Sequence, residues 1–253
     1  MPSQSHALPR VRLADRLELT KPRITLMVML TALVGFVMGS PGPLRLLLLA
    51  LALGGTGLVA AGAAVLNQLL ERDTDALMLR TRERPLAAGR VTRLEAGSFG
   101  LLLSALGLAV LLRGCGALPA LVALVTWSSY LFVYTPLKRR TPLATLVGAV
   151  PGALPPVIGW TASAGSLDPG ACILFSILFL WQVPHFLAIA WLYRDDYARA
   201  GFPMLPVVDR EGVFTARQAV VHSLALLLVS LAPVGAGMTG PGYLVGAFLL
   251  AWR

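Results

Sequence analysis

The chain has 253 residues, of which 57% are hydrophobic and only 13% are charged, and its formal net charge is +9. Soluble globular domains carry about 25% charged residues, and a soluble core could not bury so much apolar surface. The composition therefore excludes an ordinary soluble domain and indicates a helical membrane protein, for which the bilayer is the natural solvent.

Apolar runs separated by short polar breaks predict an all-α, polytopic transmembrane bundle of about eight spans. Most runs approach the roughly 20 residues that a spanning helix needs. We expect the spans at 24–40, 44–66, 94–112, 117–134, 143–164, 170–192, 219–237 and 243–252. The last run is short, so we expect an incomplete span or a half-helix at the C-terminal end.

The first twenty residues carry five charges and no apolar core, which argues against a cleaved signal peptide. We therefore expect residues 1–20 to form a cytoplasmic N-terminal segment and residues 21–253 to form one membrane domain.

The basic residues follow the predicted topology. If the N-terminus is cytoplasmic and each run crosses once, only Arg45 and Arg113 of the 21 basic residues fall on the outer side. This is the positive-inside asymmetry, and it explains the net charge without a nucleic-acid partner. Of the twelve acidic residues, Asp168 alone falls on the outer side.

Most of the cytoplasmic acids gather in two long segments, 67–93 and 193–218, and the first begins with NQLLERDTD at 67–75. Residues four apart share one face of a helix, so Asn67, Glu71 and Asp75 align within about 80°, while Asp73 points to another side. Hard oxygen ligands suit magnesium, which proteins often bind through a few carboxylates together with substrate phosphates. The alternative is a solvated helix end whose acids pair with arginines. The aligned amide and the second acidic segment favour the metal site.

The second segment is WQVPHFLAIAWLYRDDYARAGFPMLP at 181–206. His185 and Asp196 are eleven residues apart, which is close to three helical turns. If one helix continues to the bundle mouth, the two therefore share a face, and Asp196 rather than Asp195 points inward. Pro184 is expected to kink this helix. An ionisable residue inside a span is a functional candidate, and the alternative is a neutral His185 bonded to a neighbouring helix.

Two acidic helix ends facing each other across a bundle mouth could hold magnesium and a diphosphate, while the apolar bundle holds a lipid-like tail. Basic side chains would bind the remaining phosphate oxygens, or else only set topology and pair with acids. The phosphate candidates are Arg72, Arg80, Arg84 and Lys138, with Arg72 and Lys138 favoured over other basic residues such as Arg82, Arg90 and Arg93.

The stretch NQLLERDTDALMLRTRERPLAAGRV at 67–91 resembles the first motif of the UbiA-type membrane prenyltransferases, and most closely the branch that farnesylates protoheme IX (heme b). Further matches to this branch run from about residue 19 to residue 208. They are LTKPRIT at 19–25, YTPLKRRTP at 134–142, PPVIGW at 155–160, WQVPHF at 181–186 and DYARAGFPMLPVV at 196–208.

The resemblance implies a bundle of nine spans in a bacterial-type inner membrane, with Mg²⁺ between two acidic motifs. It implies farnesyl transfer from farnesyl diphosphate to the vinyl group of heme b, giving heme O, with heme A synthase as a further partner. It assigns metal and diphosphate roles to Asn67, Glu71, Asp75 and, in the second motif, Asp196, which Tyr197 follows. The chain departs from the branch at Ala144, where an asparagine is usual, and ends before the ninth span.

When the diphosphate leaves, the allylic farnesyl fragment becomes cation-like. Aromatic side chains could shield this fragment by cation–π contact, or could be ordinary membrane-interface aromatics. The candidates are Tyr130, Tyr134 and Trp160. We expect His185 to orient the porphyrin through its iron or its propionates. Two alternatives stay open: transfer to another aromatic acceptor such as a quinone precursor, and a transporter or lipid-binding scaffold. Transport predicts acids at mid-membrane or on both faces, whereas here the acids lie almost wholly on one.

Overall fold

The computed structural model describes residues 12–240, 242–243 and 245–247, and within these ranges the chain is helical with no strand. Six helical segments are long and apolar enough to cross a membrane: Leu46–Asp75, Arg93–Gly114, Ala117–Leu137, Ala144–Ala164, Pro169–Leu192 and Val213–Gly235. Helix α2 (Pro22–Met38) adds a seventh span when it is joined to α1 (Leu13–Leu19), from which it is bent by 48°. The all-α membrane bundle predicted from the sequence is thus confirmed. The predicted eighth run, 243–252, falls largely outside the described residues.

Several spans consist of more than one helical piece. Helix α3 (Leu46–Asp75) and α4 (Arg93–Gly114) are continuous, whereas the next span joins α5 (Ala117–Ser128), a π-helical segment η1 (Ser129–Tyr134) and the single turn α6 (Thr135–Leu137). The following span divides at Leu154 into α7 (Ala144–Ala153) and α8 (Pro155–Ala164), where two prolines begin the second piece. Proline is favoured at the start of a helix because its missing N–H has no partner there.

The helix that carries His185 is shorter than the sequence pattern suggested. Pro184 lies inside α9 (Pro169–Leu192) without ending it, but α9 stops at Leu192. Tyr193 leaves the helical conformation with φ −110° and ψ 25°, and a separate short helix α10 (Arg194–Arg199) follows. The expectation that one helix carries both His185 and Asp196 to the mouth is therefore wrong.

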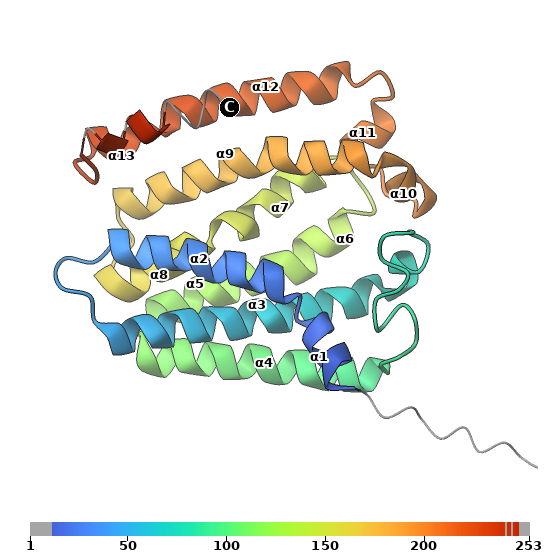
Figure 1. Cartoon of the computed structure of the whole chain (residues 1–253), viewed down its shortest axis with the longest axis horizontal. Helices are drawn as coiled ribbons and strands as arrows, with labels where there is room; N and C mark the ends of the chain where they lie inside the picture. Colours follow the sequence, from blue (N-terminus) through green and yellow to red (C-terminus); the bar gives the residue numbers. More distant parts are fainter. Residues whose placement is uncertain (1–11, 241, 244, 248–253) are drawn as a thin grey trace, which may run out of the picture.

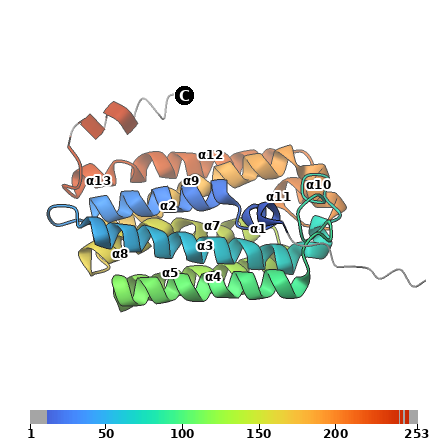
Figure 2. The ribbon, with the colours of Figure 1, turned by 60° about the horizontal axis from the view of Figure 1, so that its bottom comes forward.

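After α10 come α11 (Leu205–Val208), α12 (Val213–Val229) and α13 (Ala232–Gly235). The long helices lie side by side, with α3 against α4 and α9 against α12 (Figures 1 and 2). Helices α1 and α10 and the irregular segment 76–92 gather at one end of the bundle (Figure 1). By the positive-inside pattern this is the end predicted to be cytoplasmic.

Small residues allow the helices to approach closely. A Cβ atom on Gly159 of α8 would overlap the carbonyl oxygen of Ala32 in α2, and one on Gly62 of α3 would overlap the Ser104 side chain in α4. Membrane helices associate through such packing, because lipid tails are as apolar as the side chains and supply no hydrophobic drive between helices.

Candidate active site

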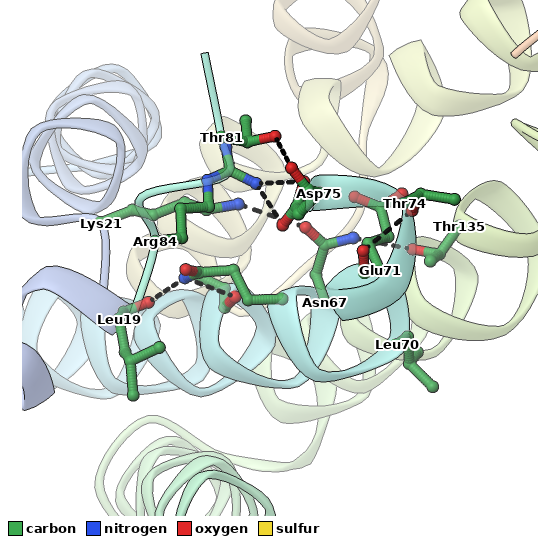
Figure 3. A network of polar contacts seen from close by, with 12 residues as sticks. Leu19, Lys21, Asn67, Leu70, Glu71, Thr74, Asp75, Thr81, Arg84 and Thr135 are labelled. Carbon is green, nitrogen blue, oxygen red and sulfur yellow. Dashed lines mark hydrogen bonds and ion pairs between the residues drawn. The ribbon is translucent and has the colours of Figure 1, made fainter. Parts of the chain in front are cut away.

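The last three turns of α3 present one polar face to the interior of the bundle. Asn67, Glu71 and Asp75 are only 2%, 4% and 1% exposed, and they point the same way in Figure 3. Asp73 points away, with a side chain that is 81% exposed and 3.4 Å from Arg93. The helical spacing therefore separated the inward acids of this motif from the outward one.

Lys21 reaches this face from the bend between α1 and α2. Its backbone is left-handed, with φ 49°, and it is the one non-glycine residue with positive φ among the described residues. That conformation is costly, particularly before a proline, and such strain is a feature of functional positions. The Nζ atom of Lys21 lies 3.2 Å from Oδ1 of Asn67, whose amide nitrogen donates to Oγ1 of Thr135 at 3.2 Å (Figure 3).

Sequence reasoning missed Lys21 and Thr135 as members of the site. A lysine directly before the proline that begins the first span was the available signal for Lys21. Thr135 follows the π-helical segment, and π-helical turns are frequent at functional sites but have no clear sequence signature.

Glu71 is paired with Lys138, which follows the single turn α6. Its Oε1 atom lies 2.6 Å from Lys138 Nζ, and both side chains are largely buried. Apart from this ion pair, the buried Oε1 atom accepts no hydrogen bond from the described residues. The Lys138 ammonium also lies 5.3 Å from the centre of the Tyr134 ring and 5.4 Å from that of Phe202. Burial opposes the charged form of Lys138, but its neighbours Tyr134 and Glu71 raise its pKa above the ordinary value, so it stays cationic.

Asp75 is paired with Arg84. One guanidinium nitrogen donates to both carboxylate oxygens, at 2.9 and 2.7 Å (Figure 3). Arg84 belongs to the segment 76–92, which folds back over the end of α3. Arg72 holds this segment in place, because its Nε atom donates to the carbonyl oxygen of Leu86 at 3.1 Å. The structure thus brings Arg84 to the acids and uses Arg72 to position the loop that carries it.

We call the assembled set of residues the polar cluster; it consists of Lys21, Asn67, Glu71, Asp75, Arg84 and Lys138. Three basic side chains face two carboxylates, so the cluster carries excess positive charge. An anionic group entering here would favour the charged form of Lys21 and would be attracted to the cluster.

The polar cluster fits a divalent cation by its donor chemistry. Asn67, Glu71 and Asp75 offer hard oxygens, and one Glu71 oxygen is buried without a hydrogen bond. Among the residues that the structure describes, no group of three acidic, histidine or cysteine side chains lies together as a metal site. A cation bound here would therefore need other oxygens in addition, and substrate phosphates are the usual source.

Asp196 has partners outside the polar cluster. Its two oxygens accept the backbone N–H groups of Leu79 and Arg80 at 3.3 and 3.2 Å, and Arg199 donates at 2.8 Å. The second acidic segment thus fastens to the segment 76–92 that follows the first. The structure brings the two segments into contact but does not place the Asp196 carboxylate with Glu71 and Asp75 in one ligand set.

Five other predicted residues lie around the site or along α9. Tyr134 stacks on Tyr130 with a centroid distance of 5.6 Å, and Tyr197 meets Phe202 edge-on at 6.0 Å. The guanidinium of Arg80 lies 5.0 Å from the centre of the Tyr193 ring, away from the polar cluster. His185 is exposed on α9.

Trp160 is placed where it cannot act on a head group at the end of the bundle that holds the polar cluster. Its indole nitrogen donates to Asp168 at 3.1 Å, and Asp168 caps the start of α9 at the opposite end of the bundle (Figure 1). The expectation that Trp160 shields a reacting cation is therefore wrong, and its role is to anchor the outer turn.

A bundle of apolar helices that encloses buried carboxylates and excess basic side chains at one end defines a multi-pass membrane protein built to bind an anionic head group. The chain belongs to the UbiA prenyltransferase family, whose family model matches residues 28–253. Similar relatives include the protoheme IX farnesyltransferase of Solibacter usitatus, which is 50% identical over 93% of this chain and 84% of its own length. The protein of the same name from Aquifex aeolicus is 44% identical over 93% of this chain and 81% of its own length.

Solved structures share the fold. A structure described as digeranylgeranylglyceryl phosphate synthase superposes with a TM-score of 0.78 at 18% identity, over 94% of this chain and 83% of that one. A UbiA homologue from Archaeoglobus fulgidus, bound to DMAPP and Mg²⁺, superposes with a TM-score of 0.74 at 21% identity, over the same shares of the two chains. These similarities establish the architecture, and the relatives of higher identity bear on the reaction.

Proposed function

We propose that this chain transfers the farnesyl group of farnesyl diphosphate to the vinyl group of protoheme IX, giving heme O. Relatives named protoheme IX farnesyltransferase, at 44–50% identity over most of both chains, support the donor and the acceptor. The observation that carries the proposal is the polar cluster, in which Lys21, Arg84 and Lys138 converge on Asn67, Glu71 and Asp75.

The diphosphate would bind in the polar cluster, and the farnesyl tail would lie among the apolar helices. Asn67, Glu71 and Asp75 would hold magnesium, as the Mg²⁺-bound relative supports. When bound, magnesium supplies a Lewis acid that neutralises charge on the departing diphosphate. Asp196 would help from the second acidic segment by holding the segment 76–92, and with it Arg84, over the head group.

The basic residues act on the charge that develops as the carbon–oxygen bond breaks. The bonding electron pair leaves with the diphosphate, and Lys21, Arg84 and Lys138 stabilise it there without rearranging. The allylic fragment is left cation-like, and the stacked rings of Tyr130 and Tyr134 lie beside Lys138, where they could shield it. A vinyl carbon of heme then forms the new carbon–carbon bond, water adds to the neighbouring carbon, and a proton is released.

The same proposal fixes the orientation in the membrane. We place the N-terminus and the polar cluster on the cytoplasmic side of a bacterial inner membrane, since the basic residues concentrate at that end. Residues 1–20 would form a cytoplasmic segment and 21–253 a single membrane domain. A heme A synthase would be a partner that consumes the product.

The test is to purify the chain into lipid nanodiscs, add Mg²⁺ and farnesyl diphosphate, and offer either heme b or an aromatic-acid quinone precursor. We expect mass spectrometry to find hydroxyethylfarnesyl heme in the first reaction and no prenylated acid in the second. Prenylation of the aromatic acid without modification of heme would overturn the proposal. A parallel reaction with EDTA in place of Mg²⁺ should form no product.

A further inference from the structure

His185 is an ionisable group inside a membrane span, and no polar partner for it lies within the residues that the structure describes. Neither of its ring nitrogens makes a hydrogen bond within the described part of the chain, whereas Nδ1 of His222, in α12, is 2.8 Å from the carbonyl oxygen of Gln218. An unpaired imidazole in a bilayer is costly, so a ligand that satisfies it is the physical expectation. His222 needs no such ligand and supplies a control within the same protein.

The His185 ring lies flat on a second aromatic ring. It stacks on the indole of Trp181, one turn earlier, with a centroid distance of 4.7 Å and an interplanar angle of 16°. Trp181 is itself 47% exposed. The two rings thus form an exposed aromatic surface, and the His185 ring carries nitrogen atoms that can bind a metal.

This surface continues a face of α9 that packs against the bundle near the start of the helix. Leu174 is eleven residues before His185, so the two share a face of the helix. Leu174 is buried against Trp160 of α8, together with Met38 at the end of α2. Toward the cytoplasmic end the same face carries Trp181, His185 and Leu192, which are all exposed. Near the start of α9 this face is covered by protein, and from Trp181 to Leu192 it is open.

The open face ends at a pocket that contains an arginine. Leu192, the last residue of α9, lines a pocket of about 480 Å³ with Arg80 and Tyr193. Arg80 has no acidic partner within ion-pair distance among the described residues, and its guanidinium rests on the Tyr193 ring. Asp195 and Asp196 also line this pocket. The Asp195 side chain is 91% exposed and lies 3.8 Å from Arg194, while the Asp196 carboxylate is already occupied by the backbone N–H groups of Leu79 and Arg80 and by Arg199. The pocket therefore keeps a positive group that can receive a carboxylate.

We propose that the porphyrin acceptor docks along α9, with its iron at the His185 imidazole, its ring edge near Trp181, and its propionate carboxylates at Arg80. This inference rests on the proposed function, which makes protoheme the acceptor. Imidazole is a common axial ligand of heme iron, and arginine binds carboxylates through paired hydrogen bonds. In this arrangement Arg80 binds the propionates of the acceptor and does not bind the diphosphate.

The iron contact is tested by titrating heme b into the nanodisc-bound protein without farnesyl diphosphate and recording the Soret band. We expect His185→Ala to lose the histidine-ligated spectrum and to weaken heme binding by at least about tenfold, while His222→Ala matches the unmodified chain. Free imidazole should restore the spectrum of His185→Ala. An unchanged spectrum and Kd in His185→Ala would overturn the assignment.

The propionate contact is tested with Arg80→Gln and, as its control, Arg82→Gln, since Arg82 is exposed and pairs only with the neighbouring Glu83 within the described structure. Arg80→Gln should weaken heme binding by about tenfold, and heme dimethyl ester, which lacks the carboxylates, should bind both variants alike. Equal affinity of Arg80→Gln and Arg82→Gln for heme would overturn this part.

The docking site and the proposed function can be rejected independently of each other. Formation of hydroxyethylfarnesyl heme by the unmodified chain, combined with normal heme spectra in His185→Ala, would reject the docking site and leave the proposed function standing. Histidine-ligated heme that is never farnesylated would reject the proposed function instead.

Discussion

Glu71 and Lys138 are held 2.6 Å apart although 66 residues of chain separate them, so the ion pair joins the end of α3 to the end of the span that begins with α5. Their contact sets the spacing between two sides of the polar cluster. Because both side chains are largely buried, neither charge can be compensated by bulk water if the other is removed.

Removal of one member of this pair should be more damaging than removal of both. Lys138→Met leaves a buried carboxylate and should lower the free energy of unfolding by about 3 kcal/mol, while Glu71→Gln together with Lys138→Met should recover part of that loss. Denaturation in mixed detergent micelles measures the change. A single variant as stable as the unmodified protein would show that water reaches the pair.

The two aspartates of the first motif should respond differently to neutralisation. Asp75→Asn removes a charge that is paired with Arg84 inside the polar cluster and should lower heme farnesylation by at least about 100-fold. Asp73→Asn changes an exposed side chain and should stay within about twofold of the unmodified rate. Similar losses in both variants would contradict the assignment of the inward face.

Helix crossing should be sensitive to a single added methyl group. At Gly159 of α8, a Cβ atom would overlap the Ala32 carbonyl and lie 2.8 Å from the Phe36 nitrogen, so Gly159→Ala should destabilise the fold by about 1–3 kcal/mol. Gly54 in α3 has nothing within 4 Å of the corresponding position, and Gly54→Ala should be neutral or stabilising by up to about 1 kcal/mol. Thermal unfolding midpoints of the two variants, compared in one detergent, test the difference.

Asp209 should make the start of α12 sensitive to acid. Its Oδ2 atom accepts the backbone N–H of Thr215 at 2.7 Å and the Thr215 hydroxyl at 2.8 Å. The backbone hydrogen bond from Thr215 lowers the pKa of Asp209 below its ordinary value of 3.8. The stabilisation is therefore fully present above that ordinary value and is lost as the pH falls through the lowered one.

Hydrogen exchange of the first turn of α12 measures this effect. Asp209→Ala should exchange faster at neutral pH and lose the acid dependence, whereas Glu211→Gln, at an exposed position of the same turn, should behave as the unmodified chain. Equal protection in Asp209→Ala and the unmodified chain would show that the cap contributes nothing.

The local features of this protein were readable from residue order. Apolar run lengths predicted the membrane spans, and four-residue spacing put Asn67, Glu71 and Asp75 on one face while turning Asp73 outward, because helical periodicity is a property of neighbouring residues. The resemblance of the motifs to the UbiA-type prenyltransferases agrees with the family to which the chain belongs.

Tertiary structure decided which partners those residues meet. The bend at Lys21, the return of the segment 76–92 and the break at Tyr193 determine that Arg84 rather than Arg72 reaches Asp75, and that Asp196 binds the backbone of Leu79 and Arg80. Such contacts join residues far apart in the chain through irregular backbone. Their geometry depends on how whole helices pack and on which buried polar groups remain to be satisfied, and no local spacing rule encodes either.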